Sequence, residues 1–91
     1  PIFEVEFEDG ISEFEIKHEE TGKKLKVIYD FYNGDELIFD ATTRSVTING
    51  ITRMQTLTID SDWFDLVSGD NSFYITDGVA NVTLRYRERW L

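Results

Sequence analysis

The sequence predicts an all-β fold, an antiparallel β-sandwich of about eight short strands with one short helical turn. Apolar and polar residues alternate through most of the chain, as between Phe3 and Phe7, which is typical of strands with one buried face. Turn residues recur about every ten positions. No segment carries the apolar period of about 3.6 residues that an amphipathic helix requires. Residues 1–91 are therefore expected to form a single sandwich domain.

The alternation predicts the strands in order along the chain. They cover residues 3–7, 13–17, 24–31, 36–41, 45–49, 54–60, 73–75 and 82–87. In the sixth of these, Leu57 and Ile59 are expected to point inward. The turns between strands are predicted at Asp9-Gly10, residues 20–23, Asn33-Gly34, residues 42–44, Asn49-Gly50 and Asp77-Gly78. Residues 20–23 and both Asn-Gly pairs are expected to form hairpins, because Asn-Gly accepts the positive φ values of tight hairpin turns.

Residues 57–73 interrupt the strand pattern with a compact corner. Asp62 is expected to cap a short helical turn, and Asp65 would then lie near the positive end of that turn. Gly69 suits the left-handed residue that ends such a turn, and Asn71 suits the tight corner after it.

Within this corner the apolar side chains are dense. They are Trp63, Phe64, Leu66 and Val67. We expect the corner to plug one edge of the β-structure. Because large aromatic side chains usually bury their area, Trp63 and Phe64 are expected in the core rather than on an exposed binding platform.

The composition limits the classes of function. A formal net charge of −9 argues against nucleic acid as a partner, because phosphates would be repelled. Without cysteine the chain forms neither a disulfide nor a thiolate metal site. The apolar run at residues 37–39 is typical of the longest, so no transmembrane helix is predicted.

Candidate catalytic and metal-binding groups are few. His18 is the one histidine, and it is expected to be a solvated residue at a strand end; no serine lies in a G-x-S-x-G context. The acidic cluster at residues 60–70 could supply oxygen ligands to calcium, but its spacing departs from the EF-hand loop and helix capping explains Asp62 and Asp65. The sequence therefore predicts no enzyme, no metal and no cofactor.

Aromatic residues on a β-sandwich also raise the alternative of carbohydrate binding. Those that could stack on sugars are Tyr29, Tyr32, Trp63, Tyr74, Tyr86 and Trp90. Packing in the core or an interface is the favoured interpretation for the set. A row of two or three exposed aromatics on one sheet face would favour sugar binding, and a flat, charged face would favour a structural module.

Charges of opposite sign repeat every two residues near the two ends of the chain. Glu4, Glu6 and Glu8 share one face of the first predicted strand, and Arg85, Arg87 and Arg89 share one face of the last. Such a pattern would suit a cross-strand ladder if the two strands are neighbours. In the alternative, the three arginines form an interface for an acidic neighbour.

Several stretches together resemble the C-terminal domain of the distal tail proteins of long-tailed phages and prophages of Gram-positive bacteria. They are residues 34–40 (GDELIFD), residues 44–50 (RSVTING), the corner with Trp63, Phe64, Leu66, Gly69 and Asn71, and the closing Tyr86-Arg87-x-Arg89-Trp90. The likeness runs over nearly the whole chain.

This resemblance implies a galectin-like β-sandwich at the tail-tip hub, or baseplate, of a virion assembled in the bacterial cytoplasm. It implies a structural adaptor, without enzymatic activity, for tail tube, fibre or receptor-binding proteins. The galectin sugar motif His-x-Asn-Pro-Arg is absent, because Pro1 is the one proline. The alternative function is a carbohydrate-binding domain that contacts the host cell wall.

The resemblance also suggests a longer protein. The chain opens on Pro1-Ile2-Phe3 without a starting methionine, so we expect an N-terminal belt domain to be missing. In the family that domain builds a homo-hexameric ring, whereas the isolated C-terminal domain is expected to be a monomer.

Overall fold

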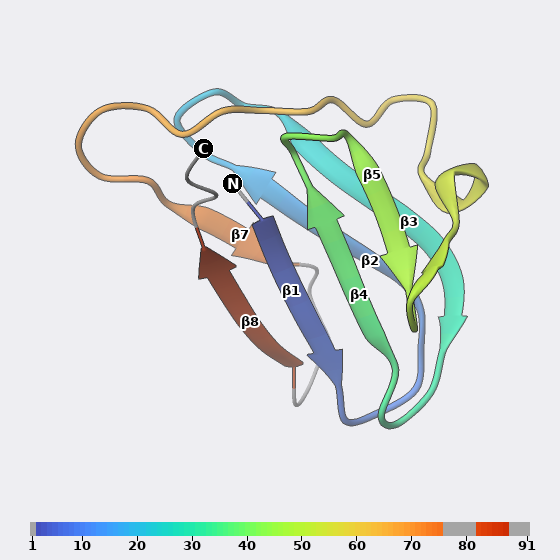
Figure 1. Cartoon of the computed structure of the whole chain (residues 1–91). Helices are drawn as coiled ribbons and strands as arrows, with labels where there is room; N and C mark the ends of the chain where they lie inside the picture. The colour runs from blue at the N-terminus through green and yellow to red at the C-terminus, as the bar shows by residue number, and fades with distance from the viewer. Residues whose placement is uncertain (1, 76–81, 88–91) are drawn as a thin grey trace.

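Two antiparallel sheets face each other in the computed structural model, which describes residues 2–75 and 82–87 (Figure 1). The strands are β1 (Ile2–Phe7), β2 (Ile11–His18), β3 (Lys24–Phe31), β4 (Glu36–Asp40), β5 (Ser45–Ile48), β6 (Ile51–Thr52), β7 (Phe73–Ile75) and β8 (Val82–Arg87). One sheet has the order β6-β5-β4-β1-β8, and the other has the order β3-β2-β7. The predicted all-β sandwich is confirmed.

The core lies between the sheets and follows from the alternation along each strand. In β1, Phe3, Val5 and Phe7 are buried, whereas Glu4 is half-buried and Glu6 is exposed. The Phe7 ring stacks on Phe31 of the opposite sheet at 4.1 Å between centroids and meets the edge of Phe14 at 5.5 Å. Edge and offset arrangements of this kind stabilise aromatic clusters beyond the area they bury.

Strand β1 lies between β4 and β8, so the first and last described strands are neighbours, as the charge pattern suggested. Glu4 is directly opposite Arg85 in the backbone register. Glu6 is opposite Thr83, and Arg87 is opposite Ile2, so the acidic and basic residues do not match one to one. Arg89 lies outside the described residues.

The Asn33-Gly34 turn is not a hairpin, which corrects the prediction. Strands β3 and β4, which it connects, belong to different sheets. It is still a tight turn: the Asp35 N–H donates to the Tyr32 carbonyl at 3.0 Å, and Gly34 has a φ of 91°. Phe7 at the end of β1 exchanges two main-chain hydrogen bonds with this turn, with Gly34 and Asp35. The local turn signal was correct, but it does not specify which strands pair.

Asn49-Gly50 does form a hairpin, between β5 and β6, with φ values of 52° and 80° as a two-residue turn requires. The Asn49 side chain accepts a hydrogen bond from the Glu36 N–H at 2.9 Å and donates to Asp35 at 3.0 Å. It therefore ties the two Asn-Gly turns together at one end of the sandwich. The expected hairpin at residues 20–23 is also present, between β2 and β3.

The strand predicted at residues 54–60 is absent. A 3₁₀ turn, η1 (Met54–Thr56), replaces its start, and Ile59 is fully exposed rather than inward. The segment 57–62 instead follows the outer edge of β3, where the Thr58 and Asp62 N–H groups donate to main-chain carbonyls of that strand. The segment covers part of an edge that would otherwise present unpaired groups. The alternating sequence of residues 57–62 therefore belongs to a segment that covers the edge of β3 and does not form a full strand.

We expect Phe7→Ala to lower the free energy of unfolding by about 3–5 kcal/mol, because it empties a buried site between the two sheets. Urea denaturation followed by fluorescence measures the change. Tyr32→Ala is the control, since Tyr32 is exposed and adjoins the same end of the sandwich. Equal losses in the two variants would contradict the packing described.

Candidate functional site

The second part of the corner, residues 61–72, runs along one end of the sandwich, from the edge of β3 to β7 (Figure 1). Phe64 is buried there, with its ring 5.6 Å from Phe3. Trp63 is partly buried and packs its edge on Phe39 at 6.4 Å. The two aromatic side chains of the corner thus both contact rings of the five-stranded sheet. Of the remaining apolar residues, Leu66 is half-buried and Val67 is exposed.

No helical turn begins at Asp62, so that part of the prediction is wrong. Residues 61–67 are irregular, and the one helical turn of the described residues is η1. The Asp62 N–H donates to the Lys24 carbonyl at 2.8 Å, which holds the chain on β3 and leaves Asp62 outside any helix. Gly69 has a φ of 90°, the left-handed region expected of it.

His18 is fully buried, which corrects the expectation of a solvated residue. Its ring stacks on Phe64, with centroids 4.8 Å apart and an interplanar angle of 10°. The Nε2 atom lies 2.7 Å from Asn71 Oδ1, and Nδ1 lies 2.8 Å from Thr21 Oγ1. The signal for burial was in the sequence, because His18 continues the inward set of Phe14 and Ile16 at a period of two.

Asn71 closes the loop that His18 supports. Its Oδ1 accepts a hydrogen bond from the Val67 N–H at 2.9 Å, and its Nδ2 donates to the carbonyls of Val67 and Gly69. These partners fix the orientation of the amide, so Oδ1 is the acceptor for His18 as well. Nε2 of His18 therefore carries a hydrogen and donates it to Asn71 Oδ1, while Nδ1 pairs with the Thr21 hydroxyl.

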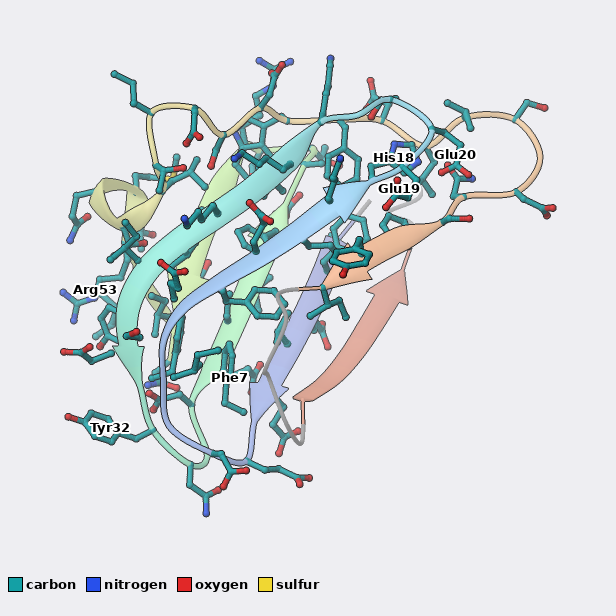
Figure 2. All side chains as sticks on the ribbon, turned by 180° about the vertical axis from the view of Figure 1, so that it is seen from behind. Phe7, His18, Glu19, Glu20, Tyr32 and Arg53 are labelled. Carbon is teal, nitrogen blue, oxygen red and sulfur yellow. The ribbon has the colours of Figure 1, made fainter. Side chains whose placement is uncertain are left out.

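Glu20 joins the same network from the β2–β3 turn, beside His18 (Figure 2). One carboxylate oxygen accepts the Ser72 N–H at 2.7 Å and lies 3.5 Å from His18 Nε2. The hydrogen bond from the Ser72 N–H holds the pKa of Glu20 below its ordinary value. The Glu19 N–H also donates to the Ser72 carbonyl at 2.9 Å, so this turn and the corner are held together by main chain and side chain.

The network is a structural clasp, joining His18, Glu20, Thr21, Asn71 and Ser72. His18 is shielded from solvent, so its imidazole cannot reach a substrate from the surface. Both of its nitrogens are already paired within the protein. The arrangement can thus fix the end of β2 against the corner, and its imidazole is not exposed as a base.

The first acidic residue of the corner, Asp60, is paired within the protein. The Asp60 carboxylate lies 3.1 Å from Lys24 Nζ and accepts a hydrogen bond from the Thr58 hydroxyl at 2.6 Å. The bond from Thr58 is the largest cause that lowers the pKa of Asp60, and Lys24 is the next. Asp60 in turn raises the pKa of Lys24. Across the described residues, no three acidic or histidine side chains converge to hold a metal ion. Among those same residues there is also no helix long and apolar enough to cross a membrane.

The candidate sugar-stacking aromatics do not form a row within the described residues. Tyr32 and Tyr74 are exposed, whereas Tyr29 and Trp63 pack against the core. Tyr32 follows the end of β3 that pairs with Ile11, and Tyr74 pairs with Lys17 at the other end of β2. About six residues of strand, roughly 20 Å, separate them. Trp90 and the side chain of Tyr86 lie outside the described residues.

The outer face of the three-stranded sheet is instead charged. Glu13 pairs with Lys26 at 3.6 Å, and Glu15 pairs with Lys24 at 3.5 Å across β2 and β3. These side chains are a third to a half exposed, so each pair contributes little to stability. Their alternation of sign neutralises the face locally.

We expect Asn71→Ala to lower the free energy of unfolding by about 1–3 kcal/mol, because the His18 Nε2–H loses its acceptor in a dry interior. Asp70→Ala changes an exposed neighbour and should alter stability by less than about 0.5 kcal/mol. Chemical denaturation of the two variants measures the difference. An Asn71 variant as stable as the Asp70 variant would show that the clasp contributes nothing.

Glu20 should make stability depend on pH in the acid range. Because its pKa is lowered on folding from an ordinary value of 4.5, its contribution is present above that pH and is lost as the pH falls through the lowered pKa. Glu20→Gln keeps an acceptor for the Ser72 N–H and removes the charge. The melting temperature of the wild type should exceed that of the variant at pH 7, and the gap should close as the pH falls. A gap that persists to pH 2 would refute this linkage.

Comparison with known proteins identifies the family. A family model described as the siphovirus-type tail component, C-terminal domain, matches residues 1–90. The distal tail protein of Bacillus phage SPP1 is 47% identical over 51 residues, which make up 56% of this chain and 20% of that protein. No solved structure gives a significant match, so the galectin-like likeness stays a prediction. The chain therefore belongs to the siphovirus-type tail component family, as a C-terminal domain.

Proposed function

We propose that the chain is a non-catalytic structural module of a phage or prophage tail tip, and that it acts there as an adaptor between tail proteins. The observation that carries this proposal is the family match over residues 1–90. The candidate partners are tail tube, tail fibre and receptor-binding proteins.

A stiff module is what an adaptor needs, because each flexible element would lose entropy on every contact. The described part of the chain is tied at both ends of the sandwich. The Asn49 side chain fastens the turns at one end, and the clasp of His18 and Asn71 fastens the corner at the other. The segment 57–62 covers part of the edge of β3. These features support a rigid spacer.

An adaptor binds its partners more tightly when several copies of it are held on one scaffold. A preceding belt domain that forms a homo-hexameric ring would place several copies of this module around one axis. Weak contacts, one from each copy, then combine into avidity that a single copy cannot reach. In isolation the chain would be a monomer, since its net charge of −9 opposes self-association.

The arginines near the end of the chain are a further predicted contact, with an acidic neighbouring protein. Arg85 and Arg87 are two positions apart in β8, whose backbone pairs with β1. Docking of an acidic neighbour by Arg85, Arg87 and Arg89 is a prediction that a charge-reversal variant of these residues would test.

Native mass spectrometry of the 91-residue chain and of a longer protein that carries it tests the proposal. We expect a monomer for the first and a ring for the second. A glycan array tests the carbohydrate alternative, with a Tyr32→Ala, Tyr74→Ala double variant as the control. Tight binding of a defined glycan by the short chain, lost in that variant, would replace the adaptor role with a lectin role. A longer protein that stays monomeric would refute the hub.

A further inference from the structure

Arg53 carries a donor that the fold leaves unsatisfied. Its Nε atom is buried and has no hydrogen-bond partner, and among the described residues its guanidinium forms no ion pair. Buried N–H groups are almost always paired, so an exception needs a reason. A chain of net charge −9 offers many carboxylates, and none in the described ranges 2–75 and 82–87 pairs with Arg53.

The main chain of Arg53 is, by contrast, firmly held. Its N–H donates to the Val46 carbonyl at 2.9 Å, and its carbonyl accepts both the N–H and the hydroxyl of Thr56. The next residue, Met54, accepts the Val46 N–H on its sulfur at 3.2 Å. These bonds complete the edge of β5 beyond the short strand β6. The backbone therefore presents the guanidinium from a fixed position, and only the side chain is left to turn.

Exposed apolar residues adjoin Arg53 along the chain. Ile51 on β6 is 55% exposed, and Met54 on η1 is 40% exposed. The turn η1, which begins directly after Arg53, lies against both β3 and β5. Figure 2 shows Arg53 beside β3, with Tyr32 farther along it. We call Ile51, Arg53 and Met54 the Arg53 rim.

We propose that the Arg53 rim is a docking surface for a protein segment that presents a glutamate or aspartate between apolar side chains. A guanidinium matches a carboxylate with two parallel hydrogen bonds, one of them from Nε. Arginine and methionine are enriched at protein interfaces. Turning the guanidinium outward toward a carboxylate breaks no hydrogen bond to the described part of the protein. Binding then satisfies the donor that folding leaves unpaired.

A carboxylate fits this surface better than a phosphate of nucleic acid does. The overall negative charge repels a polyanion, whereas a single carboxylate flanked by apolar groups uses both the charge of Arg53 and the exposed Ile51 and Met54. The inference rests on the proposed function only in taking the occupant to be a neighbouring protein.

The probe is the blocked peptide acetyl-Leu-Glu-Leu-amide, titrated into the ¹⁵N-labelled chain while the Arg53 Nε–H resonance is followed by NMR. Acetyl-Leu-Gln-Leu-amide is the matched control peptide. We expect a saturable downfield shift with the glutamate peptide and none with the glutamine peptide. Arg53→Lys keeps the charge but loses the planar pair of donors, so affinity should fall by about tenfold. Arg44→Lys, in the turn between β4 and β5, should leave affinity unchanged.

A separate variant tests the apolar part of the Arg53 rim. Ile51→Ser should weaken the glutamate peptide without altering the fold, since Ile51 is exposed on a two-residue edge strand. The proposal is overturned if the two peptides shift the resonance equally, or if inorganic phosphate at equal ionic strength gives the same saturable shift. It is also overturned if Nε–H shows an exchange peak to a bound water that the glutamate peptide does not displace. None of these outcomes bears on ring formation, which native mass spectrometry measures separately.

Discussion

The contact of β1 with the opposite sheet is the interaction on which the rest of the structure depends. Strand β1 is paired on both sides, by β4 and β8, so its backbone has no freedom to shift register. Phe3 near one end meets Phe73 of β7, and Phe7 at the other end meets Phe14 and Phe31. One strand thus holds the two sheets at both ends. A small domain without disulfides has to obtain its stability from such packing.

Each end of the sandwich is then closed by an asparagine side chain in place of regular pairing. Asn49 bonds the start of β4 at one end, and Asn71 bonds the loop of the corner at the other. An amide has both a donor and an acceptor, so it can replace a missing main-chain partner on either side. Asn71 does more, because its oxygen also satisfies the buried His18. The corner is therefore ordered by a polar contact and by Phe64 stacked on the same imidazole.

The alternation of apolar and polar residues predicted most of the fold, because every second side chain of a half-buried strand points into the core. The same alternation places His18 on the buried face of β2, after Phe14 and Ile16. The prediction of a solvated His18 followed the polarity of histidine instead of this alternation. Turn signals are local, so Asn33-Gly34 could be recognised as a turn while the change of sheet after β3 could not. The segment 57–62 was missed for a related reason. It bonds an edge without joining the sheet, and no sequence period distinguishes the two.

The His18 clasp and Arg53 differ in whether their buried polar atoms have hydrogen-bond partners within the protein. That difference distinguishes a structural role from a binding role. At the clasp, both nitrogens of the buried His18 have partners within the protein, so its imidazole is fully used in holding the fold. At Arg53 the main chain is equally satisfied, but the side chain is not. Folded proteins rarely leave a shielded donor unpaired without use, and local departures from self-consistency tend to mark functional positions. For the adaptor role proposed above, the unpaired Arg53 Nε beside the exposed Ile51 and Met54 is where a partner would gain most from binding.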